Sequence, residues 1–309
     1  MRLDIWIVIA VILICGCSTP TEVIDRESKI PSDAVKMTPE TDVYPPILHS
    51  ERYEKPVPFD AVNSRGAEDS PFIPYDSDDI YFFYTPDVRV PVEKQLLDEV
   101  TGVYVTERTG DGWDAPKRVM LQKKGKLALD GCEYVDHDHI MVCSAREGYT
   151  GINWFSADRK DEVWGNFQKV DFDPAYEVGE LHIYDDELYF HSSRAGGEGQ
   201  LDMWMSKKTD SGWGEPEHID AVSTPESEGW PYISRDGKEL WFTRFYNGSP
   251  AIFMSKRTDK DGEWGEPELI VSRFAGEPTL DSSGNLYFTH HYYKDNKMIE
   301  ADIYVAKKK

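Results

Sequence analysis

The sequence predicts an all-β protein, a β-propeller with five blades that an N-terminal strand closes. The first observation is a repeat. The phrase Trp-Gly-Glu-Pro-Glu stands at residues 213–217 and 264–268, with looser copies at 113–116 and 164–167. A period of about fifty residues is typical of propellers and solenoids. The second observation is that 13% of the residues are aromatic, which suits a sheet-rich core.

Two apolar runs recur in each repeat and predict its central strands. Short continuous apolar runs are typical of strands that are covered on both faces, as blades are by their neighbours. An Asp-Gly turn at 236–237 precedes one of them and indicates a hairpin. The best helix candidate is residues 92–100. The first runs are 80–83, 140–142, 188–190, 240–242 and 286–288, and the second are 103–106, 152–155, 203–206, 252–255 and 303–306.

The N-terminal part of the repeat region supplies the strand that closes the ring. Each type of apolar run occurs five times, but the tryptophan turn occurs only four times. Residues 53–62 superpose without gaps on 213–222, with Pro56 on Pro216 and an identical Asp-Ala-Val. We therefore expect residues 49–309 to form the propeller, with five blades favoured over six. Closure matters because an open ring would expose unpaired strand edges.

The first residues of the chain predict a signal peptide and therefore export of the protein from the cytoplasm. Arg2 is followed by about ten apolar residues, too few to span a bilayer but enough for the core of a signal peptide. The run ends in Ile14-Cys15-Gly16-Cys17, which resembles the lipobox of bacterial lipoproteins. The resemblance implies a signal peptide at 1–16 and a lipid anchor on Cys17. An ordinary secretory signal with two incidental cysteines is the alternative.

The region from 17 to 48 is expected to be a disordered tether, because it combines several prolines with polar residues and has no apolar periodicity. Together with the lipobox, it predicts a protein of the cell envelope. If the host has two membranes, Ser18 resembles an outer-membrane sorting signal, so the protein would face the periplasm or the cell surface. The membrane is then a partner through Cys17.

The net charge of −23 excludes one class of partner. Binding to a nucleic-acid backbone needs a basic patch that replaces counterions, and an acidic chain with a pI near 4.7 does not provide one. We expect no nucleic-acid partner and no cofactor.

The repeat resembles the WD40-like propeller units of the TolB family, which read like Ser-x-Asp-Gly-Lys-x-Leu-x-Phe-Thr followed by an Ile-Tyr strand. Residues 234–243 and 252–255 match this phrase closely, and the second repeat departs from it most, with His137-Asp138 at its turn. The resemblance covers about residues 53–309. It implies the architecture and says little about activity, because propellers carry many functions.

The candidate site lies where two sets of loops leave the same face of a propeller, at the mouth of its channel. Arginines could bind a carboxylate or a peptide terminus, and aromatic side chains could bind a stacking ligand. The alternative is that these arginines and glutamates pair with each other and hold the blades in register. The candidates are Arg194, Arg244, His290, His291, Glu228, Glu277, Glu180 and Glu68.

Two further motifs lie in the second repeat. The run 136–139 has metal-ligand residue types, but a tight turn there spoils the geometry, so we expect no metal site. If His137-Asp138 is a two-residue turn, Cys132 and Cys143 lie opposite each other across a hairpin and can form a disulfide. Two free buried thiols are the alternative.

The sequence favours a binding module over an enzyme. It has no Gly-x-Ser-x-Gly elbow and no other strong catalytic motif. The leading hypothesis is a lipid-anchored propeller that binds a protein, a peptide or a cell-envelope ligand at its loop face. The alternative is a glycan-active hydrolase, which would need two carboxylates about 5 to 10 Å apart, and Glu180, Glu228 and Glu277 are the candidates.

Overall fold

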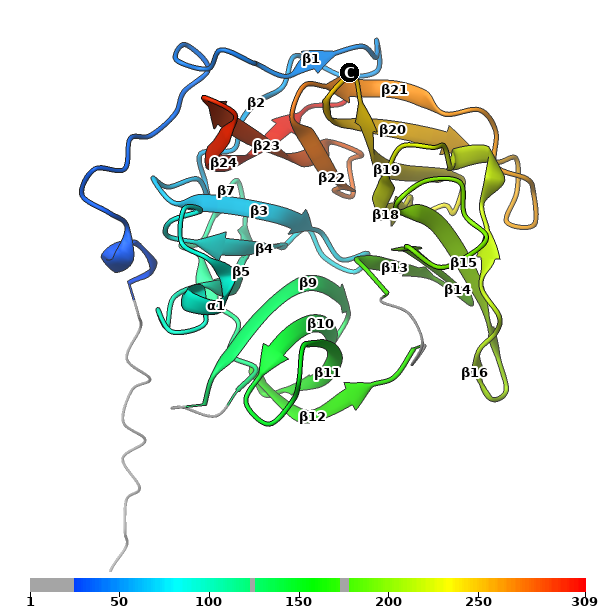
Figure 1. Ribbon diagram of the computed structural model, residues 1–309, viewed down its shortest axis with the longest axis horizontal. Helices are drawn as coiled ribbons and strands as arrows, with labels where there is room; N and C mark the ends of the chain where they lie inside the picture. The colour runs from blue at the N-terminus through cyan, green and yellow to red at the C-terminus, as the bar shows by residue number, and fades with distance from the viewer. Residues whose placement is uncertain (1–24, 123–125, 173–177) are drawn as a thin grey trace, which may run out of the picture.

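Five antiparallel sheets surround a common centre in the computed structural model (Figure 1), which describes residues 25–122, 126–172 and 178–309. Each sheet is one blade. Its first strand in sequence lies nearest the centre and its later strands lie progressively toward the rim. The predicted five-bladed propeller is confirmed. None of the helices in the described ranges is long and apolar enough to cross a membrane.

The first two blades follow the predicted apolar runs. In each, the first run forms the second strand and the second run forms the third strand. From inner to outer, blade 1 comprises β3 (Ala67–Phe72), β4 (Ile80–Thr85), β5 (Gly102–Thr106) and β8 (Lys117–Arg118), and blade 2 comprises β9 (Ala128–Asp136), β10 (His139–Arg146), β11 (Ile152–Lys160) and β12 (Val163–Val170).

The third and fourth blades have the same order. Blade 3 comprises β13 (Leu181–Tyr184), β14 (Glu187–Ser192), β15 (Asp202–Thr209) and β17 (Glu217–His218), with β16 (Gly212–Trp213) also on β15. Blade 4 comprises β18 (Glu228–Ile233), β19 (Glu239–Tyr246), β20 (Ser249–Lys256), β21 (Glu268–Ser272) and, as an added outer strand, β1 (Ile47–Leu48).

The fifth blade joins the two ends of the chain. Its strands are β22 (Ala275–Leu280), β23 (Leu286–Lys294), β24 (Lys297–Ala306) and the N-terminal β2 (Val57–Pro58). Val57 lies opposite Val305, and Tyr53 makes a further bridge to Lys308. The prediction that residues 53–62 supply the outer strand of the last blade is confirmed. Pro58 is tolerated because it lies on an edge strand, where its missing N–H leaves no ladder unpaired.

Short elements complete the chain. The helix candidate at 92–100 shortens to one turn, α1 (Val92–Gln95), and the other short elements are η1 (Arg26–Lys29), η2 (Asp220–Val222), β6 (Arg108–Thr109) and β7 (Gly112–Trp113).

Repeat tryptophans pack against aromatic rings of neighbouring segments. The Trp264 ring lies 6.0 Å from Tyr189 of blade 3 and the Trp113 ring 5.2 Å from Phe59. Both contacts join segments that are distant in sequence.

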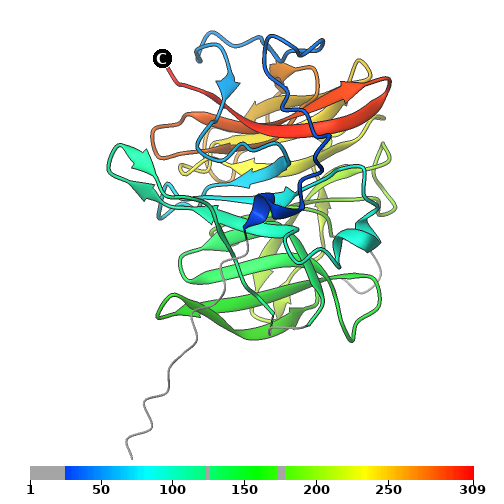
Figure 2. The same cartoon turned by 90° about the vertical axis from the view of Figure 1, so that its left-hand side faces the viewer.

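Residues 25–48 differ from the expected disordered tether. Arg26 pairs with Glu68 of blade 1 at 3.0 Å, Lys36 pairs with Glu300 of blade 5 at 2.7 Å, and β1 adds to blade 4. Figure 2 shows this segment, in blue, running along the side of the ring. The composition did not reveal this path, because its charged residues are held by partners of opposite sign far away in the sequence. The expected signal peptide, Cys17 and residues 18–24 lie outside the described residues.

A disulfide joins Cys132 to Cys143 in blade 2, with the Cα atoms 5.3 Å apart. The predicted turn at His137-Asp138 sets the register near it, but a bulge changes the register before the cysteines, so Cys143 faces Gly131 instead of Cys132. The expected direct opposition is therefore wrong. The disulfide forms diagonally across the bulge.

Tyr53 tests how much the closing segment stabilises the ring. Its side chain is 1% exposed and meets Trp241 edge-on at 6.1 Å. We expect Tyr53→Ala to lower the free energy of unfolding by about 3–5 kcal/mol in urea titrations, as other buried aromatic truncations do. Tyr53→Phe is the control and should stay within about 1 kcal/mol of wild type, since the hydroxyl has no hydrogen-bond partner among the described residues. Equal losses in both variants would contradict this account.

Candidate functional site

The inner strands share an unusual backbone position. Ser70, Cys132, Trp230 and Glu277 all have positive φ angles between 49° and 58°, and the ladder shifts register beside each of them. These are β-bulges, which re-aim a side chain and are common next to functional sites. Glu180 occupies the equivalent position in blade 3, because it precedes the hairpin turn of that blade by the same number of residues. Every blade therefore presents one residue at the same level of the channel.

These five residues line a small central cavity of about 40 Å³, together with Glu133 and neighbouring strand residues. The volume suits an ion or a few water molecules. It is far below the 300–1,000 Å³ typical of pockets that enclose a small ligand. A larger ligand would have to dock over the mouth.

Aromatic rings close the channel beside this cavity. Phe72, Tyr134, His182 and Tyr232 each stand two residues beyond the bulge position of their strands. The His182 ring contacts the other three, with centroids 4.7 to 5.6 Å apart. His182 is 1% exposed, and burial alone lowers its pKa to about 3. The imidazole is therefore neutral at physiological pH, as its apolar surroundings require.

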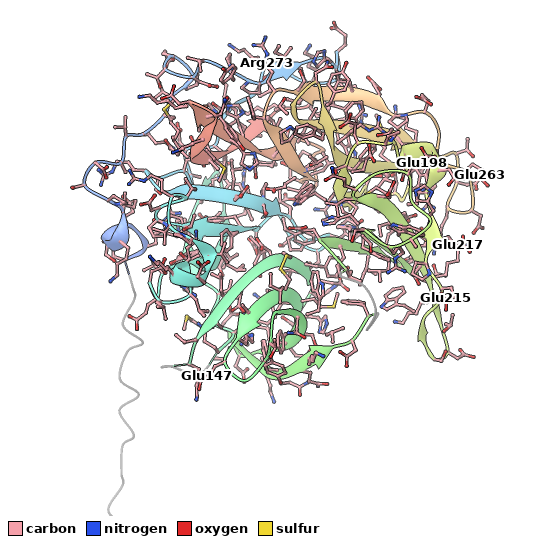
Figure 3. The ribbon with its side chains drawn as sticks, viewed as in Figure 1. Glu147, Glu198, Glu215, Glu217, Glu263 and Arg273 are labelled. Atoms are coloured by element: carbon pink, nitrogen blue, oxygen red, sulfur yellow. A yellow bond between two sulfur atoms is a disulfide. The ribbon has the colours of Figure 1, made fainter. Side chains whose placement is uncertain are left out.

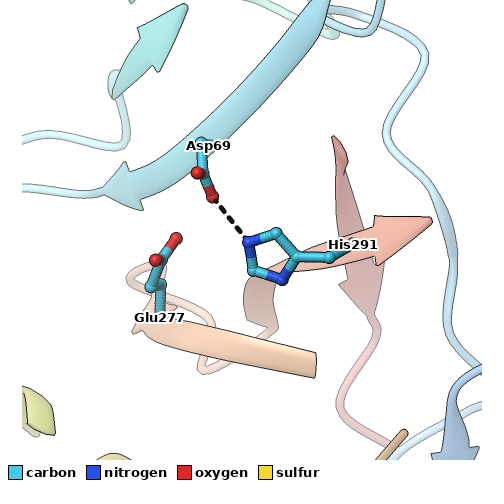
Figure 4. A group of neighbouring side chains, drawn as sticks. All are labelled: Asp69, Glu277 and His291. Carbon is cyan, nitrogen blue, oxygen red and sulfur yellow. Dashed lines mark ion pairs between the residues drawn. The ribbon is translucent and has the colours of Figure 1, made fainter. Parts of the chain in front are cut away.

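Asp69, Glu277 and His291 form one side of the site, which we call the triad (Figure 4). Asp69 comes from β3, Glu277 from β22 and His291 from β23. The Asp69 Oδ1 atom lies 3.3 Å from His291 Nε2, and one potential ligand atom of each residue lies within 4.8 Å of the others. The N–H of Ser70 and the hydroxyl of Thr289 both donate to Glu277 Oε2 at 2.8 Å, which fixes its carboxyl.

The three side chains of the triad shift one another's pKa values. Burial opposes ionisation of Asp69, but the charge of His291 and hydrogen bonds from His291, Glu277 and Thr289 lower its pKa. Burial raises the pKa of Glu277 well above its usual range, and the charge of Asp69 adds to that shift. Burial disfavours the charged form of His291, but Asp69 outweighs it and the pKa rises. Asp69 is therefore the carboxylate and Glu277 holds a proton.

His191, Glu180 and Trp230 form the opposite side. The backbone N–H of Trp230 donates to His191 Nδ1 at 3.3 Å, and His191 Nε2 lies 3.4 Å from Glu180 Oε2. Burial lowers the pKa of His191 and outweighs the charge of Glu180. A neutral ring that accepts at Nδ1 carries its proton on Nε2, so it donates toward Glu180. The Trp230 ring lies 5.1 Å from the His191 ring.

Glu133 is the most isolated acid of the site. It is 5% exposed, and neither carboxyl oxygen has a hydrogen-bond partner among the described residues. Burial raises its pKa well above the usual range, and the charges of Glu180 and Asp69 add to that shift. We call Asp69, Glu133, Glu180 and Glu277 the channel acids. The acids labelled in Figure 3, such as Glu217 and Glu263, are exposed at the periphery of the ring instead.

Five of the eight predicted site residues are held by other contacts. Glu228 and Glu68 are 0% exposed. Arg244 Nε lies 2.8 Å from Glu228, its neighbour across the strands. The residue opposite Glu68 is a tyrosine, so Arg26 from the N-terminal segment pairs with Glu68 instead. These contacts match the alternative of pairing within the scaffold. The remaining two are His290, which is 0% exposed and 2.9 Å from Asp42, and Arg194, which packs over the rings of Phe190 and Trp204.

Three predicted residues do meet at the channel: Glu180, Glu277 and His291. Sequence reasoning did not select Asp69, Glu133 or His191. The signal that could have found Asp69 and Glu133 is their position, next to the bulge residues that align across the blades. The candidate metal run at 136–139 is exposed, with His137 beside Asp136 and His139 beside Asp158. No group of three potential ligands forms there among the described residues.

Comparisons with known proteins show the fold and nothing finer. No family model matches the chain, and no curated protein matches it significantly. A protein of unknown function from Dyadobacter fermentans is similar in structure, with a TM-score of 0.51 and 10% identity over 86% of this chain and 97% of that one. Further similar structures are an endo-arabinase from Bacteroides thetaiotaomicron (TM-score 0.48, 15% identity, 76% and 92% covered) and TolB from Acinetobacter baumannii (0.46, 10%, 81% and 56%). The chain belongs to the class of five-bladed propellers.

The buried His182 predicts a pH-dependent stability. The unfolded chain binds a proton at His182 near pH 6.5 but the folded protein only near pH 3, so stability is lost as the pH falls between these values. Between pH 7 and pH 4.5, wild type should lose about 2 to 3 kcal/mol more than His182→Phe, as measured by urea unfolding. Phenylalanine is the matched control because Phe72 already fills the equivalent position in blade 1. Parallel pH profiles would contradict the prediction.

Proposed function

We propose that this protein is a binding module whose ligand docks at the channel mouth, on the channel acids and Trp230. The observation that carries the proposal is the convergence of side chains from all five blades on one cavity, with polar atoms that the scaffold does not use. Buried polar groups in proteins are nearly always satisfied, so a set that faces one opening indicates a ligand.

The chemistry of the mouth selects the ligand class. Asp69 is ionised and its carboxylate only accepts hydrogen bonds, so the ligand presents donors such as hydroxyl or ammonium groups. The half-buried Trp230 ring offers a stacking surface beside them. A glycan of the cell envelope or an amine-bearing peptide or protein segment meets both requirements. The cavity itself is too small for a sugar ring, so such a ligand lies across the mouth.

We further propose that Cys17 anchors the protein to a membrane of the cell envelope, following the lipobox-like residues. Eight residue steps separate Cys17 from Asp25, where the described structure begins. Such a segment spans at most about 30 Å. The propeller would therefore stay close to the bilayer, much closer than a tether of 32 residues would allow.

Binding measurements test the proposed module. The purified protein is immobilised and exposed to panels of cell-envelope oligosaccharides and of peptides with free amines. We expect Trp230→Ala and Glu180→Gln to weaken binding of any hit at least about tenfold, because each removes a direct contact worth at least about 1.4 kcal/mol. Glu217→Gln, at an exposed site on the rim, is the control and should bind as wild type does. Hits that neither channel variant weakens would refute the proposed site.

A glycan-active hydrolase is the second candidate. The observation that favours it is that Asp69, Glu180 and Glu277 are each partly exposed at one mouth. A pair of such acids at a suitable separation could act as acid and as base or nucleophile. Hydrolysis of plant and algal oligosaccharides, lost in Glu180→Gln, would support it over a pure binding role. Glu228→Gln should lower stability without abolishing turnover, since Glu228 is buried against Arg244.

The lipid anchor has a separate test. The full chain is expressed in a bacterial host, and the membrane and soluble fractions are compared. We expect wild type in the membrane fraction and Cys17→Ser in the soluble fraction or in uncleaved form, because the substituted chain has no thiol to acylate. Cys15→Ser is the matched control and should stay with the membrane. Equal fractionation of all three proteins would rule out an anchor at Cys17.

A further inference from the structure

The channel acids differ from several deeply buried acids of the propeller in their partners. Glu68, Asp130, Glu187 and Glu228 each pair with an arginine at 2.7 to 3.0 Å. Glu300 pairs with Lys36 at 2.7 Å. No lysine or arginine lines the central cavity in the part of the chain that the structure describes. The channel therefore gathers four carboxyl groups without the arginine or lysine partner that these five buried acids have.

A carboxyl group that is buried without a charged partner or a hydrogen bond is destabilising. His291 compensates Asp69 in part. Glu133 remains buried, without a hydrogen-bond partner in the described ranges, and it lines the same cavity as Glu277. A cation in this cavity would supply what is missing.

We propose that Asp69, Glu277 and His291 bind one divalent transition-metal ion, of the class of Mn²⁺ or Zn²⁺. The three potential ligand atoms lie within 4.8 Å of one another, so small side-chain rotations bring them to the 2.0–2.2 Å that such ions require. They come from three strands of two adjacent blades, β3 of blade 1 and β22 and β23 of blade 5, which fixes their backbones (Figure 4).

The ligand types decide which ion is favoured. Once the ion displaces the proton of Glu277, two carboxylates and one imidazole suit Mn²⁺, Fe²⁺ or Zn²⁺, whereas Ca²⁺ and Mg²⁺ prefer oxygen alone. Three protein ligands leave coordination positions open, which water can fill. The hydrogen bonds from Ser70 and Thr289 to Glu277 act as outer-shell contacts that orient the ligand.

This inference goes beyond the proposed function, and the two can fail separately. Trp230→Ala should lose the docked ligand and keep the ion, because Trp230 lies outside the triad. Loss of the ion in Asp69→Asn is expected whether or not any glycan or peptide binds. A bound ion without a docked ligand would support the metal site and not the proposed binding module.

Calorimetric titration of the chelator-treated full chain tests the site. We expect one Zn²⁺ or Mn²⁺ per chain, with Zn²⁺ the tighter and Ca²⁺ at least tenfold weaker than either. Asp69→Asn, Glu277→Gln and His291→Gln should each weaken Zn²⁺ binding at least tenfold. His139→Gln is the matched control, because His139 also lies beside a carboxylate, Asp158 at 2.8 Å, but has no third ligand; it should bind as wild type does.

Three outcomes would overturn the proposed metal site. They are no bound ion in wild type, undiminished binding in the triad variants, and loss of the ion in His139→Gln. If a triad variant fails to fold, anomalous diffraction from wild-type crystals soaked in Zn²⁺ replaces it. A peak in coordination range of Asp69, Glu277 and His291 supports the site, and a peak elsewhere or none refutes it.

Discussion

The pairing of β2 with β24 is the constraint on which the ring depends. Each blade can bury its faces only against two neighbours, and an unclosed ring would leave two faces and two edges in water. Val57 and Pro58 close the fifth blade with a short edge strand, and Tyr53 continues the contact to Lys308. The N-terminal segment extends this role, because it also reaches blade 1 through Arg26 and blade 4 through β1.

Closure gives the five inner strands a common centre, and their bulges give that centre its chemistry. A regular strand would alternate its side chains between the two faces of a blade, each covered by a neighbour. The positive φ at Ser70, Cys132, Trp230 and Glu277 interrupts this alternation at one level. Polar side chains can then stand at the channel while apolar ones fill the spaces between blades.

The distribution of charge follows the same division. Several buried acids within the blades have an arginine partner, such as Glu228 with Arg244 in blade 4 and Asp130 with Arg146 in blade 2. These pairs fix strands to one another. The channel acids have no arginine or lysine partner among the described residues. Burial raises the pKa of Glu133 and Glu277, whereas His291 outweighs burial and lowers the pKa of Asp69, and shifted pKa values of this kind are common at functional sites.

The sequence by itself determined the number of blades, the central strands and the closing segment, because repeated apolar runs and the match of 53–62 to 213–222 depend only on local pattern. It also singled out Glu180, Glu277 and His291. Only the tertiary structure decided that Arg194, Arg244, Glu68, Glu228 and His290 are held by the scaffold, and that Asp69, Glu133 and His191 join the channel. The sequence of one repeat does not show which partner a buried side chain meets, as with His290 and Asp42, since such contacts follow from how the blades pack around the centre.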